Sequence, residues 1–303
     1  MDRRLEVDLA GVKLKNPIIT ASGTFASGKE FGEIIDLNKL GGITVKGISH
    51  EPWLGNPPPR VAETYGGMLN AVGLQNLGAQ SFIMNDLPFL KEFDVKVIVN
   101  LCGRSVPDYV AVIRDFEKVE GIDIFELNIS CPNIKAGGMA MGTDPIMTEK
   151  VTKDVKKHAK APVFVKLSPN VTNIVDIAKA AEAGGADGIS LINTLLGMKI
   201  DIKKRAPILG NTFGGLSGPA IMPVAVRMVY QVAKAVNLPI IGMGGITTAH
   251  DAIEFIMAGA TAVAVGTANF SNPMATMNIL NGLTDYVEKH EINSLDEIRG
   301  CVQ

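Results

Sequence analysis

The chain has 303 residues, 47% of them hydrophobic, and its 29 basic and 31 acidic side chains nearly cancel in charge. A near-neutral chain without a basic stripe is not expected to bind nucleic acid, since contacts with the phosphate backbone require an excess of positive charge. Three cysteines and four scattered histidines provide no disulfide framework, metal site or iron–sulfur site, which favours a reducing cytoplasm.

The sequence also argues against export and against a membrane span. Residues 1–8 carry acids where a signal peptide has its apolar core. The longest nearly uncharged stretch, residues 255–270, is short and interrupted by a glycine turn. We therefore expect no membrane association.

Short, β-branched apolar runs recur along the chain and predict buried parallel strands. In chain order they cover residues 17–20, 42–46, 96–100, 124–128, 163–167, 188–193, 239–243 and 262–266. Amphipathic helical patterns lie between them: one follows Thr172 and ends at Gly184, and another opens at Thr247 or Thr248. This alternation predicts an α/β fold of the (β/α)8 TIM-barrel type. A doubly wound sheet is the alternative, but the Gly-x-Gly-x-x-Gly motif that it suggests does not follow the first strand.

Several additions to the barrel are predicted. Residues 5–15, with Gly11 at their centre, predict an N-terminal β-hairpin. Insertions follow the second strand (49–90), the fourth strand (the glycine-rich residues 135–142) and the sixth strand (195–218). They leave from the C-terminal ends of strands, where barrel active sites lie. No linker divides the chain, so we predict a single domain over residues 1–303.

Polar side chains end most of the predicted strands, and a barrel would direct them at one cavity. They are Ser22, Lys46, Asn100, Asn128, Lys166, Asn193 and Thr194. Any one of them could be a polar residue that merely leaves the core. That explanation is poor for the two lysines, because an unpaired ammonium buried in a strand is costly. Together these residues predict a cup with two positive charges and several amides, suited to a polar, planar, anionic ligand.

Glycine turns after the seventh and eighth predicted strands indicate a phosphate site. Residues 242–247 (GMGGIT) and 266–267 (GT) would present bare N–H groups at the start of helices. Phosphate binding at this place recurs in barrels. The two turns together predict a phosphorylated cofactor or substrate.

Cys131 lies at the base of the predicted glycine-rich loop, three residues after Asn128. A thiol at that position can touch a bound small molecule. A buried structural cysteine is the alternative.

These motifs together resemble the catalytic subunits of class 1B dihydroorotate dehydrogenases, FMN-containing enzymes of pyrimidine synthesis. The resemblance covers nearly the whole chain. It is carried by residues 44–47 (TVKG), 56–60 (NPPPR), 70–76 (NAVGLQN), 128–133 (NISCPN), 166–169 (KLSP), 193–194 (NT), 215–219 (GLSGP) and 244–246 (GGI).

The resemblance implies one FMN per chain and dihydroorotate as the substrate. The implied cofactor contacts are Ser22, Lys46, Gly47, Asn100, Asn128, Lys166, Ile192, Gly218, Gly244, Gly245, Gly266 and Thr267, with the phosphate on the last four. The implied substrate contacts are Lys46, Asn70, Ala71, Val72, Gly73, Leu74, Asn128, Asn193 and Thr194. Cys131 is implied as the base that takes the C5 proton while the C6 hydride passes to flavin N5. Lys166 is implied to stabilise the charge of the reduced flavin.

The class 1B resemblance further implies a partner subunit that carries FAD and a [2Fe–2S] cluster and passes electrons to NAD⁺. The assembly would be a heterotetramer built on a homodimer of catalytic subunits. A class 1A, fumarate-dependent enzyme is the near alternative and predicts an active homodimer without a partner. A phosphate-binding barrel isomerase or lyase would use the same glycine turns but leaves Cys131 beside Asn128 unexplained. A non-catalytic flavin store leaves the two lysines unexplained.

Overall fold

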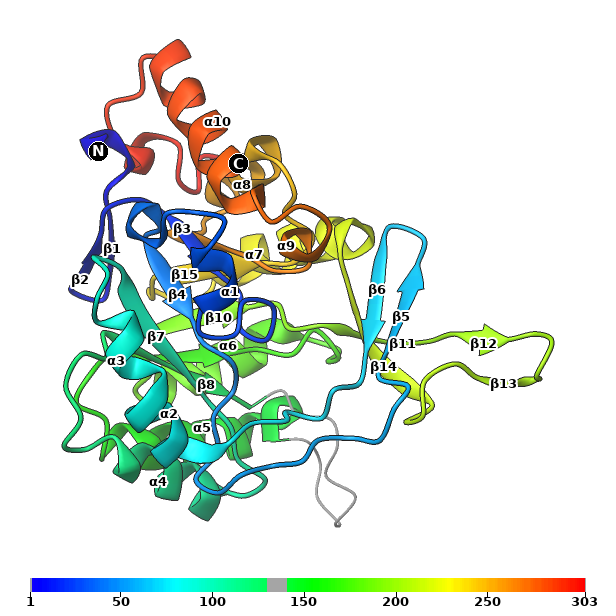
Figure 1. Ribbon diagram of the computed structural model, residues 1–303. Coiled ribbons are helices and arrows are strands. Elements are labelled where there is room, and N and C mark those ends of the chain that lie inside the picture. Colours follow the sequence, from blue (N-terminus) through cyan, green and yellow to red (C-terminus); the bar gives the residue numbers. More distant parts are fainter. Residues whose placement is uncertain (1, 130–140, 303) are drawn as a thin grey trace.

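Within residues 2–129 and 141–302, which this computed structural model describes, eight parallel strands close into a barrel (Figure 1). They are β3 (Ile18–Thr20), β4 (Gly42–Thr44), β7 (Lys96–Leu101), β8 (Ile124–Asn128), β9 (Val163–Lys166), β10 (Gly188–Leu191), β15 (Ile240–Met243) and β16 (Ala262–Val265). Pairing of β16 with β3 completes the ring. The predicted (β/α)8 barrel is confirmed.

The strands are buried on both faces, which explains their nearly continuous apolarity. Every residue of β9, β10, β15 and β16 is buried. Side chains of the strands fill the barrel, and helices cover its outside. Each fully buried valine, leucine or isoleucine contributes about 1.5–3 kcal/mol of transfer free energy, so this core dominates the stability of the fold.

Helices lie in the connections between the strands and form the outer layer (Figure 1). The α-helices are α1 (Lys29–Gly32), α2 (Gly78–Asn85), α3 (Leu87–Leu90), α4 (Val106–Asp115), α5 (Pro145–Lys156), α6 (Ile174–Ala183), α7 (Met222–Ala233), α8 (Ala249–Met257), α9 (Ala268–Ser271) and α10 (Ala275–Lys289). Short 3₁₀ turns are η1 (Arg3–Leu5), η2 (Leu37–Lys39), η3 (Met141–Thr143), η4 (Pro219–Ile221) and η5 (Leu295–Glu297).

The start of α6 differs from the prediction. The sequence pattern predicts Thr172 as the N-cap, but Asn173 occupies that position, and its side chain accepts a hydrogen bond from the N–H of Val175 at 3.1 Å. Both residue types cap helices well, so composition alone does not decide between neighbours. At α8 the N-cap is Thr248, and Asp251 completes a capping box with it.

The N-terminal hairpin is confirmed as β1 (Val7–Leu9) paired with β2 (Val12–Leu14). Ala10 and Gly11 both have positive φ angles, as the tightest hairpin turns require. Leu9 and Leu14 are buried in the main hydrophobic core, which anchors the hairpin to the barrel.

The insertions after β4 and β10 come together in one antiparallel sheet, in the order β11 (Leu195–Met198), β14 (Phe213–Ser217), β6 (Gly67–Asn70) and β5 (Val61–Thr64). Beyond it, β12 (Ile200–Asp201) and β13 (Ala206–Pro207) form an arm that projects to the right in Figure 1. The sheet has a small core of its own, made of Leu69, Ala71 and Leu209. The predicted insertion after the fourth strand lies largely outside the described residues.

None of the helices in the described ranges is long and apolar enough to cross a membrane. Over the same residues, histidine, cysteine, aspartate and glutamate side chains form no cluster that could hold a metal ion.

His50 forms a pH-dependent contact outside the barrel. Its Nδ1 lies 2.7 Å from Oδ2 of Asp115, and this hydrogen bond raises the pKa of the imidazole, with further help from the charge of Asp115. A raised pKa in the folded state means that the contact stabilises the protein fully below the ordinary histidine pKa. The stabilisation is lost as pH rises through the raised value.

Because His50 is half-exposed, we expect the contact to contribute about 1 kcal/mol or less to the free energy of unfolding. Urea unfolding at pH 5.5 and pH 8.5 measures this pH-dependent part. In Asp115→Asn the difference in the free energy of unfolding between pH 5.5 and pH 8.5 should shrink by that amount. An unchanged difference would contradict the assignment.

Candidate active site

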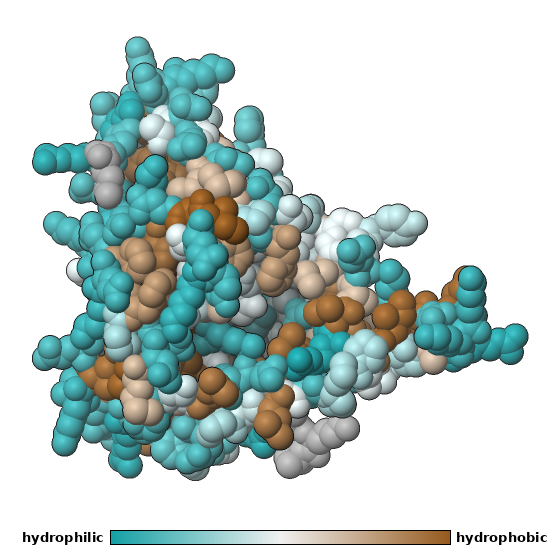
Figure 2. All heavy atoms as spheres, in the orientation of Figure 1, coloured by the Kyte–Doolittle hydropathy of each residue, from teal (hydrophilic) through white to brown (hydrophobic). Residues whose placement is uncertain are grey.

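A cavity of about 710 Å³ opens at the C-terminal ends of the barrel strands, between the barrel and the projecting sheet. Figure 2 shows this face hollowed between the two, with apolar side chains on the projecting part. Those exposed side chains include Val61, Leu196, Ile200, Ile202 and Phe213. A cavity at this end of a barrel is the usual position of an active site.

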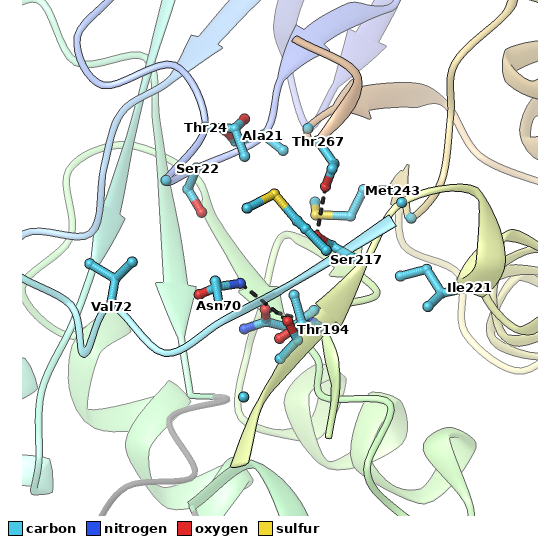
Figure 3. A pocket seen from close by; sticks show the side chains of 18 of the residues that line it. Ala21, Ser22, Thr24, Asn70, Val72, Thr194, Ser217, Ile221, Met243 and Thr267 are labelled. Carbon is cyan, nitrogen blue, oxygen red and sulfur yellow. Dashed lines mark hydrogen bonds between the residues drawn. The ribbon is translucent and has the colours of Figure 1, made fainter. Parts of the chain in front are cut away.

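The cavity brings together every predicted site residue that the structure describes. Ser22, Asn70 and Thr194 come from three distant segments and surround the same space (Figure 3). The other predicted residues in its wall are Lys46, Gly47, Ala71, Val72, Gly73, Leu74, Asn100, Asn128, Lys166, Ile192, Asn193, Gly218, Gly244, Gly245, Gly266 and Thr267. Cys131 lies outside the described residues.

A buried polar network forms the floor of the cavity. Lys166, only 4% exposed, donates from Nζ to Ser22 Oγ at 2.9 Å and lies 3.4 Å from Oε2 of Glu126. Asn100 Nδ2 donates to the same Oε2 at 2.5 Å, and Ser190 Oγ donates to Oε1 at 2.8 Å. The Lys166 ammonium thus pairs with Glu126 inside the barrel and also lines the cavity.

Glu126 and Ser190 are the members of this network that sequence reasoning missed. Glu126 interrupts the apolar run of β8, and the cost of burying a charge applies to it as much as to the lysines. That signal was present in the sequence. Ser190 carries no comparable signal, because a serine can be buried at low cost when it finds a partner.

Lys46 is the second cation of the cavity, and its surroundings differ from those of Lys166. Burial lowers the pKa of its ammonium, and the positive charge of Arg60 lowers it further. Among the described residues, no carboxylate pairs with Lys46 and no hydrogen bond from its ammonium is formed. A half-buried cation without such a partner is poised to bind an anionic group of a ligand.

The opposite end of the cavity is built from glycine turns. The N–H groups of Gly244, Gly245, Gly266 and Thr267 donate no hydrogen bond to any described residue. Thr267 Oγ1 donates to Ser217 Oγ at 2.7 Å, which ties this end to β14 (Figure 3). All four residues are partly exposed and line the cavity, so their N–H groups are available to a ligand, and a phosphate can accept from several at once.

Gly245 illustrates why this end requires glycine. Its φ angle is +85°, and a Cβ there would lie 2.8 Å from both Gly218 O and Met222 Cβ. Gly185 has nearly the same φ, +86°, but a Cβ at that position would have no other atom within 4 Å. An alanine would be strained by the backbone angle at both positions, but only at Gly245 would its Cβ also be crowded, and only Gly245 lines the cavity.

This pair provides a matched test. Gly185→Ala should lower the free energy of unfolding by about 1–2 kcal/mol through backbone strain alone. Gly245→Ala should lower it by about 1–3 kcal/mol more through crowding, and should also weaken binding at the glycine end of the cavity. Urea unfolding measures the loss of stability, and titration with inorganic phosphate measures binding at the glycine turns. Equal losses of stability in both variants, with equal phosphate affinity, would contradict the assignment.

Asn170 is a further residue of the cavity wall that the sequence patterns did not indicate. Its side chain donates to Thr194 O at 3.0 Å and accepts from the N–H of Leu196 at 2.8 Å. It therefore ties the start of β11 to the segment that follows β9 and holds the backbone of Thr194 in place.

Comparison with known proteins places this site in a family. Residues 4–287 match the sequence model of a family described as dihydroorotate dehydrogenase. The chain belongs to the dihydroorotate dehydrogenase family. The family expected from the sequence motifs is therefore confirmed.

Individual members of the dihydroorotate dehydrogenase family are similar to this chain over almost their full length. A protein of Alkaliphilus metalliredigens is 64% identical over 298 residues, which cover 98% of each chain. One of Lachnoclostridium phytofermentans is 61% identical over 297 residues, covering 98% of this chain and 99% of the relative. One of Oceanobacillus iheyensis is 54% identical over 294 residues, covering 97% of each. All three are named dihydroorotate dehydrogenase B (NAD(+)), catalytic subunit.

Proposed function

We propose that this chain oxidises (S)-dihydroorotate to orotate in de novo pyrimidine (UMP) synthesis, as a single FMN-binding domain over residues 1–303. The observation that carries the proposal is one cavity with two lysines and several amides at one end and bare glycine N–H groups at the other. In a member of this family, such a cavity suits a flavin mononucleotide together with a small anionic substrate.

The residues present fit FMN at both ends. Gly244, Gly245, Gly266 and Thr267 would hold the phosphate on their N–H groups, with Gly218 beside them. The ring system would lie over the polar floor, against Ser22, Lys46, Gly47, Asn100, Asn128, Lys166 and the backbone of Ile192. Bound there, FMN would supply the two-electron acceptor that the oxidation requires. Lys166 would offer a fixed positive charge to the ring.

Dihydroorotate would be held by the remaining polar groups of the cavity. Lys46 would neutralise its carboxylate. Amides can match a ring of alternating donors and acceptors, and the residues proposed for this are Asn70, Ala71, Val72, Gly73, Leu74, Asn128, Asn193 and Thr194. The hydrogen bonds of Asn170 to Thr194 and Leu196 support a fixed geometry on this side.

Cys131 would act as the general base that removes the proton from C5 of dihydroorotate. It lies three residues after Asn128, the last residue of β8, which lines the cavity. An ordinary thiol has a pKa near 8.5, so only a minor fraction would be thiolate at neutral pH. The rate of proton removal should therefore rise with pH.

We further propose a partner subunit that carries FAD and a [2Fe–2S] cluster and passes the electrons to NAD⁺. The assembly would be a cytoplasmic heterotetramer with a homodimer of this chain at its core. The relatives' name, catalytic subunit, supports a partner. The whole sequence contains only three cysteines, so the partner would have to supply the cluster ligands.

Acceptor specificity tests this proposal. The FMN-loaded chain is mixed with dihydroorotate and either NAD⁺ or fumarate. The assay is run on the isolated chain and on the chain co-purified with a co-expressed FAD/iron–sulfur subunit. Turnover with NAD⁺ only in the co-purified assembly is the expected result. Efficient turnover of the isolated homodimer with fumarate would instead assign the class 1A reaction.

A further inference from the structure

Glu126 lies beneath the cavity and outside its lining. The residue is 1% exposed, and Glu126 and Lys166 are the two charged residues among the buried residues of the described chain. Each sits on a barrel strand, β8 and β9, and both point into the barrel, where their side chains meet. Burial of a charged pair at the centre of a fold is costly, so a function is expected for it.

The donors around Glu126 come from three other barrel strands, β7, β9 and β10. Oε2 accepts from Asn100 of β7 at 2.5 Å and lies 3.4 Å from Lys166 Nζ of β9, while Oε1 accepts from Ser190 of β10 at 2.8 Å. Asn100 is opposite Glu126 in the β7–β8 register, and Lys166 is opposite Ser190 in the β9–β10 register. The carboxylate thus organises one layer of side chains inside the barrel.

Two of these donors also face the cavity. Lys166 and Asn100 both line it, whereas Glu126 and Ser190 do not. Asn100 Nδ2 also lies 3.3 Å from Ser22 Oγ, and Asn128 Nδ2 donates to Asn100 Oδ1 at 3.3 Å. A residue that holds Lys166 and Asn100 in place therefore also holds their partners Ser22 and Asn128, which line the cavity with them.

We propose that Glu126 is a positioning residue that holds Lys166 and Asn100 in place and, by opposing the charge of Lys166, lowers the reduction potential of the FMN bound above them. The inference rests on the proposed function. Reduction adds negative charge to a flavin, and a Lys166 ammonium without the Glu126 carboxylate beside it would favour that charge more strongly than one with the carboxylate in place. Removing the Glu126 charge should therefore stabilise reduced over oxidised FMN.

Glu126→Gln removes the charge and keeps the shape. The Gln oxygen can accept from Asn100 and Lys166, and its NH₂ group can donate to Ser190, whose hydroxyl accepts as well as donates. We expect the ratio of FMN affinities, reduced over oxidised, to rise at least about tenfold. For a two-electron couple this corresponds to an upward shift of about 30 mV. The midpoint potential is measured by anaerobic equilibration with a reference dye.

Ser190→Ala is the matched control. It removes one hydrogen bond to Glu126 and leaves both charges in place, so the potential should shift much less than in Glu126→Gln. Equal shifts in both variants would attribute the effect to disturbance of the floor. An unchanged or lower potential in FMN-loaded Glu126→Gln would overturn the proposal.

A third variant decides the case in which Glu126→Gln retains no FMN. Glu126→Asp keeps the charge with a shorter reach. If it binds FMN with a potential near that of the unmodified chain, the charge of residue 126 is required and the proposal stands. Loss of FMN in both variants would overturn the electrostatic part. Failure of the proposed function can be told apart from failure of this inference, because the unmodified chain itself would then take up no FMN. In that case both proposals would be wrong.

Discussion

Cys131→Ala is expected to lower the rate constant for flavin reduction by dihydroorotate about 10²–10⁴-fold, the usual contribution of a general base. FMN should remain bound at one equivalent per chain, because none of the residues proposed to hold it is altered. Anaerobic stopped-flow at the flavin absorbance measures the rate, and the visible spectrum measures the FMN content. A variant that loses the flavin as well would indicate a structural cysteine.

The pH dependence of the same half-reaction gives an independent check. In the unmodified chain the rate constant should rise from about pH 6 to about pH 9, through the ordinary thiol pKa. Cys301→Ala, which changes an exposed cysteine near the C-terminus, is the control and should behave like the unmodified chain. A rate constant that does not change over this range would contradict a thiol base.

Lys46→Met is expected to have two effects of opposite sign. The dissociation constant for orotate should rise about 10–100-fold, since a hydrogen bond to a charged group contributes about 1.5–3 kcal/mol. The free energy of unfolding of the ligand-free chain should stay the same or increase, because methionine keeps the length of the side chain without the cost of a buried charge. Isothermal titration measures the first effect and urea unfolding the second.

Because the pKa of Lys46 is lowered, both the stability and the orotate affinity of the unmodified chain should depend on pH in a way that Lys46→Met does not share. The folded chain holds the Lys46 proton less tightly than the unfolded chain, so the charge costs stability at low pH, and the cost is relieved as pH rises through the lowered pKa. Orotate binding to the unmodified chain should weaken over that same rise, and Lys46→Met should lack this part. Lys118→Met, at an exposed site, is the control. A large loss of stability with unchanged orotate affinity would contradict this account of Lys46.

The barrel was predictable because its strands are buried on both faces and are therefore apolar throughout, as in β9 and β16. The projecting sheet was not. Its strands β5 and β11 alternate between partly buried and exposed residues, and β6 pairs with β14, which lies nearly half the chain away in sequence. Such pairing is decided by tertiary contacts that no local pattern reports.

The cavity wall was predictable for a related reason. In a parallel barrel, side chains that follow the strand ends must share one face, so Lys46, Asn100 and Lys166 could be brought together before their contacts were known. The layer beneath required the structure, because Glu126 meets Lys166 only through the register of two neighbouring strands. Cys131 remains a prediction from the sequence and from the family.

Anaerobic addition of dihydroorotate to the purified, FMN-loaded chain tests the central claim most directly. One equivalent of dihydroorotate per flavin should bleach the visible absorbance and yield one equivalent of orotate, with no partner subunit present. A chain that takes up FMN and keeps its colour with excess dihydroorotate would contradict the proposed reaction, and a chain that takes up no FMN would contradict the proposed cofactor.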